Sequence, residues 1–150
     1  MLTVWVDADA CPRNVLACLR RLQPTLGFQL RTVSSSAHHF DDPQHLVVDA
    51  EPQATDLAIA NRLRRGDIVV TQDYGLAAVA LGKGAGAISP TGRIFRQETM
   101  PFLLEQRNLF ARHRRGGGRT RGPAARTAAD DQRFEQSFRR LLKEIQAGRA

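Results

Sequence analysis

The sequence predicts an α/β protein: a three-layer α/β/α sandwich with a mainly parallel central sheet, formed by a single domain over residues 1–150. Short β-type apolar runs alternate with helical segments along most of the chain, which is the pattern of β-α-β units. The run Ile68–Thr71 is short and apolar, as expected for a strand buried on both faces of a parallel sheet. With 42% hydrophobic and 25% charged residues, the chain can bury a sizeable core in one domain.

The first half of the chain contains three predicted strands and two predicted helices. The strands are Thr3–Val6, Phe28–Val33 and Leu46–Val48. A first helix begins near Pro12 and is ended by Pro24 and Gly27, and a second runs from Pro52 to Arg65. The residues expected on or near their buried sides are Val15, Leu16, Leu19 and Leu22 in the first helix and Leu57, Ile59, Ala60 and Leu63 in the second.

The second half continues the alternation and ends in a basic arm. Ile68–Thr71 is followed by a helix from Tyr74 and by a fifth strand, Ala87–Ser89. The turn signal at 90–92 predicts that Arg93–Phe95 forms a hairpin return. A helix near 100–114, a flexible basic linker near 115–128 and a C-terminal helix near 130–147 complete the chain.

Aspartates follow two of the predicted strands. Asp7 and Asp9 come at the end of the first strand, Asp73 follows the fourth strand, and Asp56 lies in the first turns of the second helix. Ligands of open parallel α/β sheets bind just outside the carboxyl ends of the strands. If the first and fourth strands are neighbours, these acids therefore open onto one edge of the sheet.

Such a group of carboxylates suits a hard divalent cation. Carboxylates held close together repel, and their removal from water costs several kcal/mol each unless a cation offsets the charge. Mg²⁺ or Mn²⁺ prefers oxygen ligands and keeps waters that can attack a phosphodiester. The candidate metal ligands are Asp7, Asp9, Asp56 and Asp73, of which Asp7, Asp9 and Asp73 are also the candidate catalytic residues.

Most of these acids also have a purely structural interpretation. Asp9 and Asp73 each precede a helix, and Asp is among the best N-cap residues. Asp56 could be a first-turn acid favoured by the helix dipole. Asp7 is left without a capping role, which favours the metal site. Asp67 stands at the start of its strand, at the opposite edge of the sheet, and is excluded from the site.

The positive charge of the chain belongs to its last third. The formal net charge is +7, and residues 107–150 hold twelve of the 22 Lys and Arg but only four of the 15 Asp and Glu. This asymmetry indicates an arm that meets phosphate or another polyanion, although a solvated Arg-rich surface would have the same composition. The candidate nucleic-acid-binding residues are Arg112, Arg114, Arg115, Arg119, Arg121 and Arg126.

No apolar run approaches the ~18 residues of a membrane span, and no targeting segment is visible before the first strand. We therefore expect a cytoplasmic protein with no membrane partner.

Four motifs together resemble one known family. They are Val6-Asp7-Ala8-Asp9-Ala10-Cys11-Pro12, Ala54-Thr55-Asp56, Gly66-Asp67-Ile68-Val69-Val70-Thr71-Gln72-Asp73-Tyr74-Gly75-Leu76-Ala77, and Gly122-Pro123 with Asp130 and Phe134. They resemble the YaiI/YqxD family (UPF0178), placed in the PIN-like nuclease superfamily, and the resemblance spans nearly the whole chain.

The resemblance implies a Rossmann-like, PIN-like fold and a nuclease that holds Mg²⁺ or Mn²⁺ on acids at strand ends. By position, it implies the same four aspartates as the metal-binding set, with Thr71 or Gln72 as a polar neighbour. We therefore expect a metal-dependent nuclease whose partner is RNA rather than DNA.

Two other functions compete with this hypothesis. One is a non-catalytic RNA- or DNA-binding module, in which the Arg-rich arm supplies the affinity and the acids are partly structural. The other is a haloacid-dehalogenase-like phosphatase, whose DxD signature Asp7-Ala8-Asp9 imitates. That class also needs a Lys before an acidic pair, and Lys83 stands after Asp73 instead.

Overall fold

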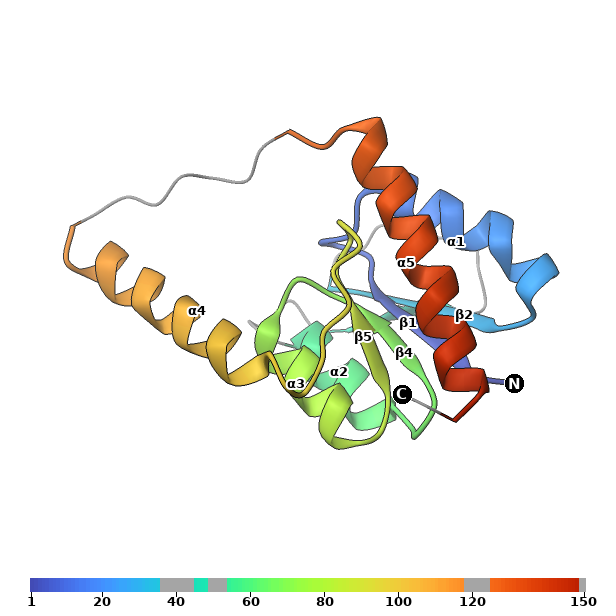
Figure 1. Ribbon diagram of the computed structural model, residues 1–150, viewed down its shortest axis with the longest axis horizontal. Coiled ribbons are helices and arrows are strands. Elements are labelled where there is room, and N and C mark those ends of the chain that lie inside the picture. Colours follow the sequence, from blue (N-terminus) through green and yellow to red (C-terminus); the bar gives the residue numbers. More distant parts are fainter. Residues whose placement is uncertain (36–44, 49–53, 118–124, 149–150) are drawn as a thin grey trace.

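The structure is a computed structural model that describes residues 1–35, 45–48, 54–117 and 125–148 (Figure 1). For residues 107, 110 and 114 only the backbone is described. Five strands form one sheet in the order β3-β2-β1-β4-β5, and every neighbouring pair is parallel. The strands are β1 (Thr3–Asp7), β2 (Gln29–Ser34), β3 (His45–Val47), β4 (Ile68–Val70) and β5 (Gly86–Ile88).

Helices cover both faces of this sheet, which confirms the predicted α/β/α sandwich (Figure 1). Side chains alternate along β1, so that Val4 and Val6 enter one core and Trp5 enters the other. The first core is closed by α1 (Arg13–Leu26) and α5 (Ala128–Gln146). The second is closed by α2 (Ala54–Arg62), α3 (Tyr74–Gly82) and the start of α4 (Met100–Arg115).

The last helix is an integral part of the first core. Phe134 and Phe138 of α5 are fully buried, and Phe138 meets Phe28 edge-on at 5.4 Å between ring centroids. A capping box at Thr127 and Asp130 fixes the start of the helix. A β-carbon at Gly86 would lie 2.6 Å from Ile145, so α5 packs directly against the backbone of β5. Helix α5 therefore anchors the C-terminal part of the chain to the body of the fold.

Several local predictions were wrong in detail. Pro24 lies inside α1 rather than ending it, and the helix stops at Leu26 because Gly27 adopts a φ of +70°. Arg93–Phe95 forms no strand; it contributes one isolated antiparallel bridge, between Ile88 and Ile94. Leu57 was expected near the buried side of α2 but is 62% exposed.

Helix α4 differs from the other helices in its position. Figure 1 shows that it begins beside α3 and then points away from the sheet. It ends at Arg115, and α5 begins at Ala128, so these two helices bracket the linker predicted near 115–128, whose residues 118–124 lie outside the described residues. Within the described residues, no helix is long and apolar enough to cross a membrane.

Candidate acidic site at the carboxyl edge of the sheet

The strand order reverses between β1 and β4. The chain builds β1, β2 and β3 outward in one direction and then places β4 on the other side of β1. A crevice at the carboxyl ends of the strands is the usual ligand site at such a switch point. Asp7 ends β1, and Asp73 lies just beyond β4. The prediction that these two strands, β1 and β4, are neighbours in the sheet is confirmed, and both acids lie at the switch point.

Asp56 and Asp73 are neighbours in this region. Burial, followed by the charge of Asp73, a side-chain hydrogen bond with Asp73 and the charge of Asp7, raises the pKa of Asp56 to about 6. The fold thus brings an acid of helix α2 against the acid that follows β4.

Asp7 is electrostatically connected to this pair. Its carboxyl group is half-buried, and burial is the largest cause that raises its pKa. The backbone N–H of Asp9 donates to its Oδ1 at 3.0 Å and lowers the pKa, whereas the charges of Asp9 and Asp73 raise it. Asp7 therefore feels the charges of both Asp9 and Asp73, so all four predicted acids are electrostatically connected.

Asp73 also has the capping role that its sequence position suggested. Its Oδ1 accepts a hydrogen bond from the backbone N–H of Leu76 at 3.0 Å, so it is the N-cap of α3. Its own N–H donates to Oγ1 of buried Thr71 at 2.9 Å. Gln72 is exposed between them. The cap and the Thr71 contact fix the direction in which the Asp73 carboxylate faces Asp56.

Asp9 has a different set of partners. Its Oδ2 accepts hydrogen bonds from the backbone N–H and the hydroxyl of Ser35, both at 2.7 Å. It does not cap α1, whose N-cap is Pro12 without a side-chain hydrogen bond. The capping interpretation of Asp9 is therefore wrong. Asp9 instead joins the turn after β1 to the residue that follows β2.

The donor chemistry of this edge fits a hard cation. Asp7, Asp56 and Asp73 offer carboxylate oxygens, the ligand type that Mg²⁺ and Mn²⁺ prefer. The side chains do not meet around a common point: within the described ranges, no three His, Cys, Asp or Glu form a group that could hold a metal ion.

Asp67 lies at the opposite edge and has a structural role, as predicted. It is 7% exposed and accepts hydrogen bonds from the backbone N–H groups of Thr3 and Arg64, each at 3.0 Å, and from Nε1 of Trp5 at 3.3 Å. Lys83 lies near the same edge, where its Nζ donates to the carbonyl of Ala60. The only Lys considered for a phosphatase is therefore far from the Asp7 edge.

The predicted nucleic-acid-binding arginines fall into different environments. Arg112 and Arg115 are exposed near the end of α4. The Nε of Arg126 is paired with Asp131 at 2.6 Å, and its Nη2 is buried with no hydrogen-bond partner among the described atoms. The side chain of Arg114 and the whole of Arg119 and Arg121 lie outside the described residues.

Arg126 lies close to the acidic edge. Its positive charge acts on Cys11, as does the negative charge of Asp7, but burial dominates and raises the pKa of the Cys11 thiol to about 12. Both Cys11 and Cys18 are free cysteines. Cys11 is therefore a packed thiol beside the site and not an activated nucleophile.

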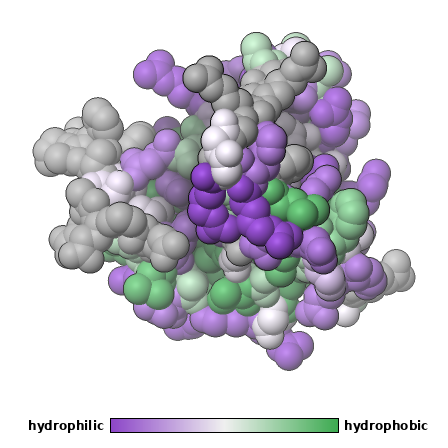
Figure 2. All heavy atoms as spheres, turned by 90° about the vertical axis from the view of Figure 1, so that its left-hand side faces the viewer, coloured by the Kyte–Doolittle hydropathy of each residue, from purple (hydrophilic) through white to green (hydrophobic). Residues whose placement is uncertain are grey.

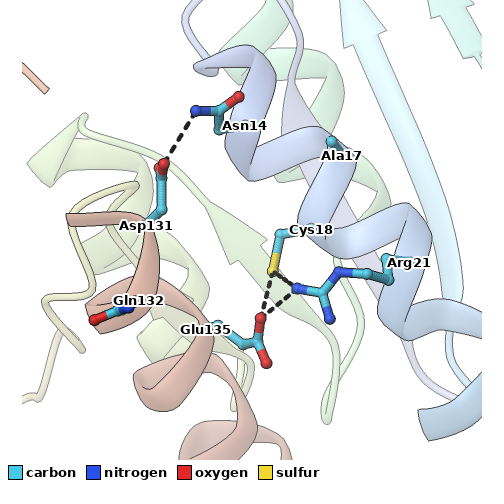
Figure 3. Close-up of a pocket in the computed structure, with 7 residues that line it drawn as sticks. All are labelled: Asn14, Ala17, Cys18, Arg21, Asp131, Gln132 and Glu135. Atoms are coloured by element: carbon cyan, nitrogen blue, oxygen red, sulfur yellow. Dashed lines mark hydrogen bonds and ion pairs between the residues drawn. The ribbon is translucent and has the colours of Figure 1, made fainter. Parts of the chain in front are cut away.

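A groove of about 410 Å³ between α1 and α5 was missed in the sequence (Figure 3). Asn14 donates to Asp131 at 3.0 Å across it, and Arg21 forms an ion pair with Glu135, which also faces the thiol of Cys18. These groups satisfy one another across the two helices. No periodicity could have indicated the groove, because it depends on how two distant helices pack.

The fold and the site together define the class of protein. It is an α/β protein with a five-stranded parallel sheet and with acidic residues at the topological switch point of that sheet. The chain belongs to the YaiI/YqxD family, since the family described as "Uncharacterized BCR, YaiI/YqxD family" matches residues 5–144. The resemblance seen in the sequence is thereby confirmed at the level of the family.

Relatives from several bacteria carry the same kind of name. A "UPF0178 protein" of Heliobacterium modesticaldum is 45% identical over 143 residues, covering 95% of this chain and 98% of its own length. One of Exiguobacterium sibiricum is 45% identical over 145 residues with the same coverage, and one of Clostridium acetobutylicum is 37% identical, covering 94% and 97%. No solved structure matches the chain.

Proposed function

We propose that this chain is a metal-dependent nuclease of the PIN-like kind, which hydrolyses phosphodiester bonds in RNA. The main support is one observation: Asp56 and Asp73 interact directly at the carboxyl edge of the sheet, and burial together with the charges of Asp73 and Asp7 raises the pKa of Asp56 to about 6. A cation bound there would relieve the repulsion among the three acids. The arrangement therefore suits a site that exchanges protons for Mg²⁺ or Mn²⁺.

In this proposal each acid has a defined task. Asp7, Asp56 and Asp73 hold the cation, which supplies positive charge to the phosphate and to the attacking water. Asp73 is pre-oriented because its carboxylate also caps α3. Asp9, predicted as a fourth ligand, keeps its second oxygen on Ser35 and thereby positions the turn that carries Asp7.

The basic arm would hold the strand to be cut. Arg112 and Arg115 are exposed near the end of α4 and can meet phosphates of the backbone. Such contacts make binding depend on salt, with a slope of about −0.7 per phosphate neutralised on a single strand. Flanking phosphates contacted by the arm would keep the RNA near the acidic edge.

The test is cleavage of a labelled single-stranded RNA in the presence of Mn²⁺. We expect Asp7→Asn and Asp73→Asn to lose activity by at least about 100-fold, since both remove a charge that holds the cation. Glu98→Gln removes an exposed carboxylate outside the site and should cleave like the unaltered protein. Activity that survives both Asp variants, or an excess of EDTA, contradicts the mechanism.

The same assay separates the competing functions. RNA that is bound with a salt-dependent affinity but never cut would favour a non-catalytic module. Turnover of p-nitrophenyl phosphate without RNA cleavage would favour a phosphatase. A duplex or flap-type DNA in parallel reactions tests the expected preference for RNA.

A further inference from the structure

Four exposed cations gather where helices α2 and α3 end. They are Arg62, Arg64, Arg65 and Lys83. The three arginines precede β4 and the lysine precedes β5, so the group borders the edge of the sheet at which these strands begin. We call it the amino-edge patch, and it lies across the sheet from the acidic site.

Contacts with the end of α2 hold two of these cations in place. Arg62 donates a hydrogen bond to the carbonyl of Ala58 at 3.1 Å, and Nζ of Lys83 donates to the carbonyl of Ala60. Cationic side chains commonly bind the last carbonyls of a helix in this way. Each keeps further N–H donors, because a guanidinium has five and an ammonium has three. Both side chains are therefore ordered and still able to bind an anion.

The other two cations have no carboxylate partner among the described residues. Asp67 follows Arg64 and Arg65 closely, but it is 7% exposed, and its carboxylate accepts three hydrogen bonds inside the fold. Glu98 is an exposed acid near the α3 side of the patch, since Gln97 before it donates to the carbonyl that ends α3 at Leu81. One such acid against four cations leaves the patch positive.

The chemistry of the patch favours phosphate groups over a protein partner. Three of its four cations are arginines, whose planar guanidinium binds phosphate through two parallel N–H bonds. Leu63 is the large apolar residue among them, and it is 5% exposed. The segment 60–66 thus lacks the exposed apolar centre of a protein interface. A strand of nucleic acid offers phosphates in a row without needing such a centre.

The patch is separate from the end of the basic arm. Figure 1 shows the end of α4 at one side of the molecule and the loop between α2 and β4 toward the other. Figure 2 looks from the side toward which α4 points, where hydrophilic residues gather at the centre of the view. Helix α2 connects the acidic site with the patch, because Asp56 lies in its first turn and Arg62 ends it, about 9 Å further along the axis. A strand that crosses the acidic edge and follows α2 reaches the patch.

We propose that the amino-edge patch is a second RNA-binding surface, which contacts phosphates of a single strand at a distance from the acidic site. The arm and the patch then hold one strand at two separate places. That the strand is RNA rests on the proposed function, whereas binding at the patch does not require that the strand is cut.

The first test is the binding of a labelled single-stranded RNA in EDTA, followed by fluorescence anisotropy at several salt concentrations. R64Q/R65Q leaves the contacts to α2 intact and should bind at least about tenfold more weakly near 0.1 M salt, with a salt slope lowered by about 1.4 for two lost phosphate contacts. R139Q/R140Q removes the same charge from an exposed part of α5, on the other face of the sheet, and should bind like the unaltered protein.

An equal loss in both double variants, no loss in R64Q/R65Q, or an unaltered protein that binds no RNA overturns the proposal. Binding of poly-glutamate in place of RNA also overturns it and points to an acidic protein. An unaltered protein that binds RNA through the patch and never cuts it supports this surface and contradicts the nuclease alone.

The second test locates the RNA on the protein. Lys83 and Lys143 are the two lysines of the chain, and both are exposed, one in the patch and one in α5. Acetylation by a succinimidyl ester, followed by mass spectrometry, measures the accessibility of each ammonium group. Saturating RNA should slow the acetylation of Lys83 at least about threefold more than that of Lys143, because phosphate contacts cover the first. Equal protection of the two lysines contradicts the location.

Discussion

Asp56 and Asp73 interact directly, although one lies in the first turn of α2 and the other caps α3. Two carboxylates held this close repel each other, and either a proton or a cation relieves that repulsion. At the pKa of about 6 that this contact and burial give Asp56, the proton is largely lost at neutral pH. Near neutral pH Asp56 therefore adds its negative charge to this edge of the sheet.

Replacing Asp56 should stabilise the protein without metal. The pKa of Asp56 is higher in the folded chain than its ordinary 3.8, so the folded state binds more protons than the unfolded state between about pH 4 and 6. Its carboxyl group therefore lowers stability as pH rises through this window, and the loss persists at pH 7. Asp56→Asn should recover up to about 1 kcal/mol at pH 7, a modest figure because solvent screens the site.

Urea unfolding at pH 7 and below pH 4 measures this effect. Below pH 4 the Asp56 carboxyl is protonated in both the folded and the unfolded state, so the stability gain of Asp56→Asn should vanish there. Glu98→Gln, an exposed acid outside the site, serves as the control and should show no gain. An Asp56→Asn protein that is less stable at pH 7 would show that the acids do not repel.

Metal binding should release a proton. Because the pKa of Asp56 is about 6, the affinity for Mn²⁺ should fall as pH drops through 6, by up to tenfold per pH unit below that value. Calorimetric titrations in buffers with different ionisation enthalpies count the protons released. We expect a fraction of a proton near pH 6 and a smaller fraction in Asp56→Asn; equal release in both proteins would place the titrating group elsewhere.

Two substitutions at Asp73 should separate its cap from its charge. Asp73→Asn keeps an N-cap oxygen for Leu76 and removes the charge, so stability should change little while metal binding is lost. Asp73→Ala removes both and should cost about 1 kcal/mol more in the free energy of unfolding. Thermal unfolding and Mn²⁺ titration of the pair test this, and equal stability of the two variants would argue against the cap.

Among these aspartates, substitution of Asp67 should destabilise the folded protein most. It is buried and accepts three hydrogen bonds, so Asp67→Ala leaves the donors of Thr3, Trp5 and Arg64 without a partner and should destabilise the protein by about 2–4 kcal/mol. Trp5 is the single tryptophan, and its fluorescence reports unfolding directly. Asp7→Asn, at the other edge, should change stability far less; the reverse order would refute this assignment.

Arginines of the basic arm should differ in what they affect. Arg115→Gln should weaken RNA binding and lower the salt slope by about 0.7 without changing stability, because its side chain is exposed. Arg126→Gln should lower the melting temperature, since it removes the ion pair to Asp131 that fixes the segment before α5. Filter binding at several salt concentrations and thermal melts compare the two. A stable Arg126→Gln would show that the pair contributes nothing.

Much of the site could be predicted because strand ends are local features. Asp7 and Asp73 follow short apolar runs, and the alternation of strands and helices requires that such runs end at a common edge. The same reasoning placed Asp67 correctly at the other edge. These predictions depend only on periodicity and chain direction, which the amino-acid sequence carries by itself.

Helix orientation was less predictable, because a helix can rotate about its axis with little change in its local sequence pattern. Leu57 was expected on or near the buried side of α2, yet it is exposed, and Thr55, Ala58 and Ile59 are buried instead. This rotation is what turns Asp56 toward Asp73. The approach of Asp56 to Asp73 was thus decided by packing against the sheet.

The amino-acid sequence by itself determined the α/β class, the strands and the edge at which Asp7 and Asp73 lie. Only the tertiary structure decided that Asp56 meets Asp73, that Asp9 binds Ser35, and that Arg126 is held by Asp131. The physical reason is the sequence distance over which each feature is determined. The periodicity of apolar residues is a property of a few neighbouring residues, whereas these contacts join segments that meet only when the helices pack on the sheet. Helix α4 shows the same division, because its sequence specifies a helix and its packing leaves Phe102 and Leu109 exposed.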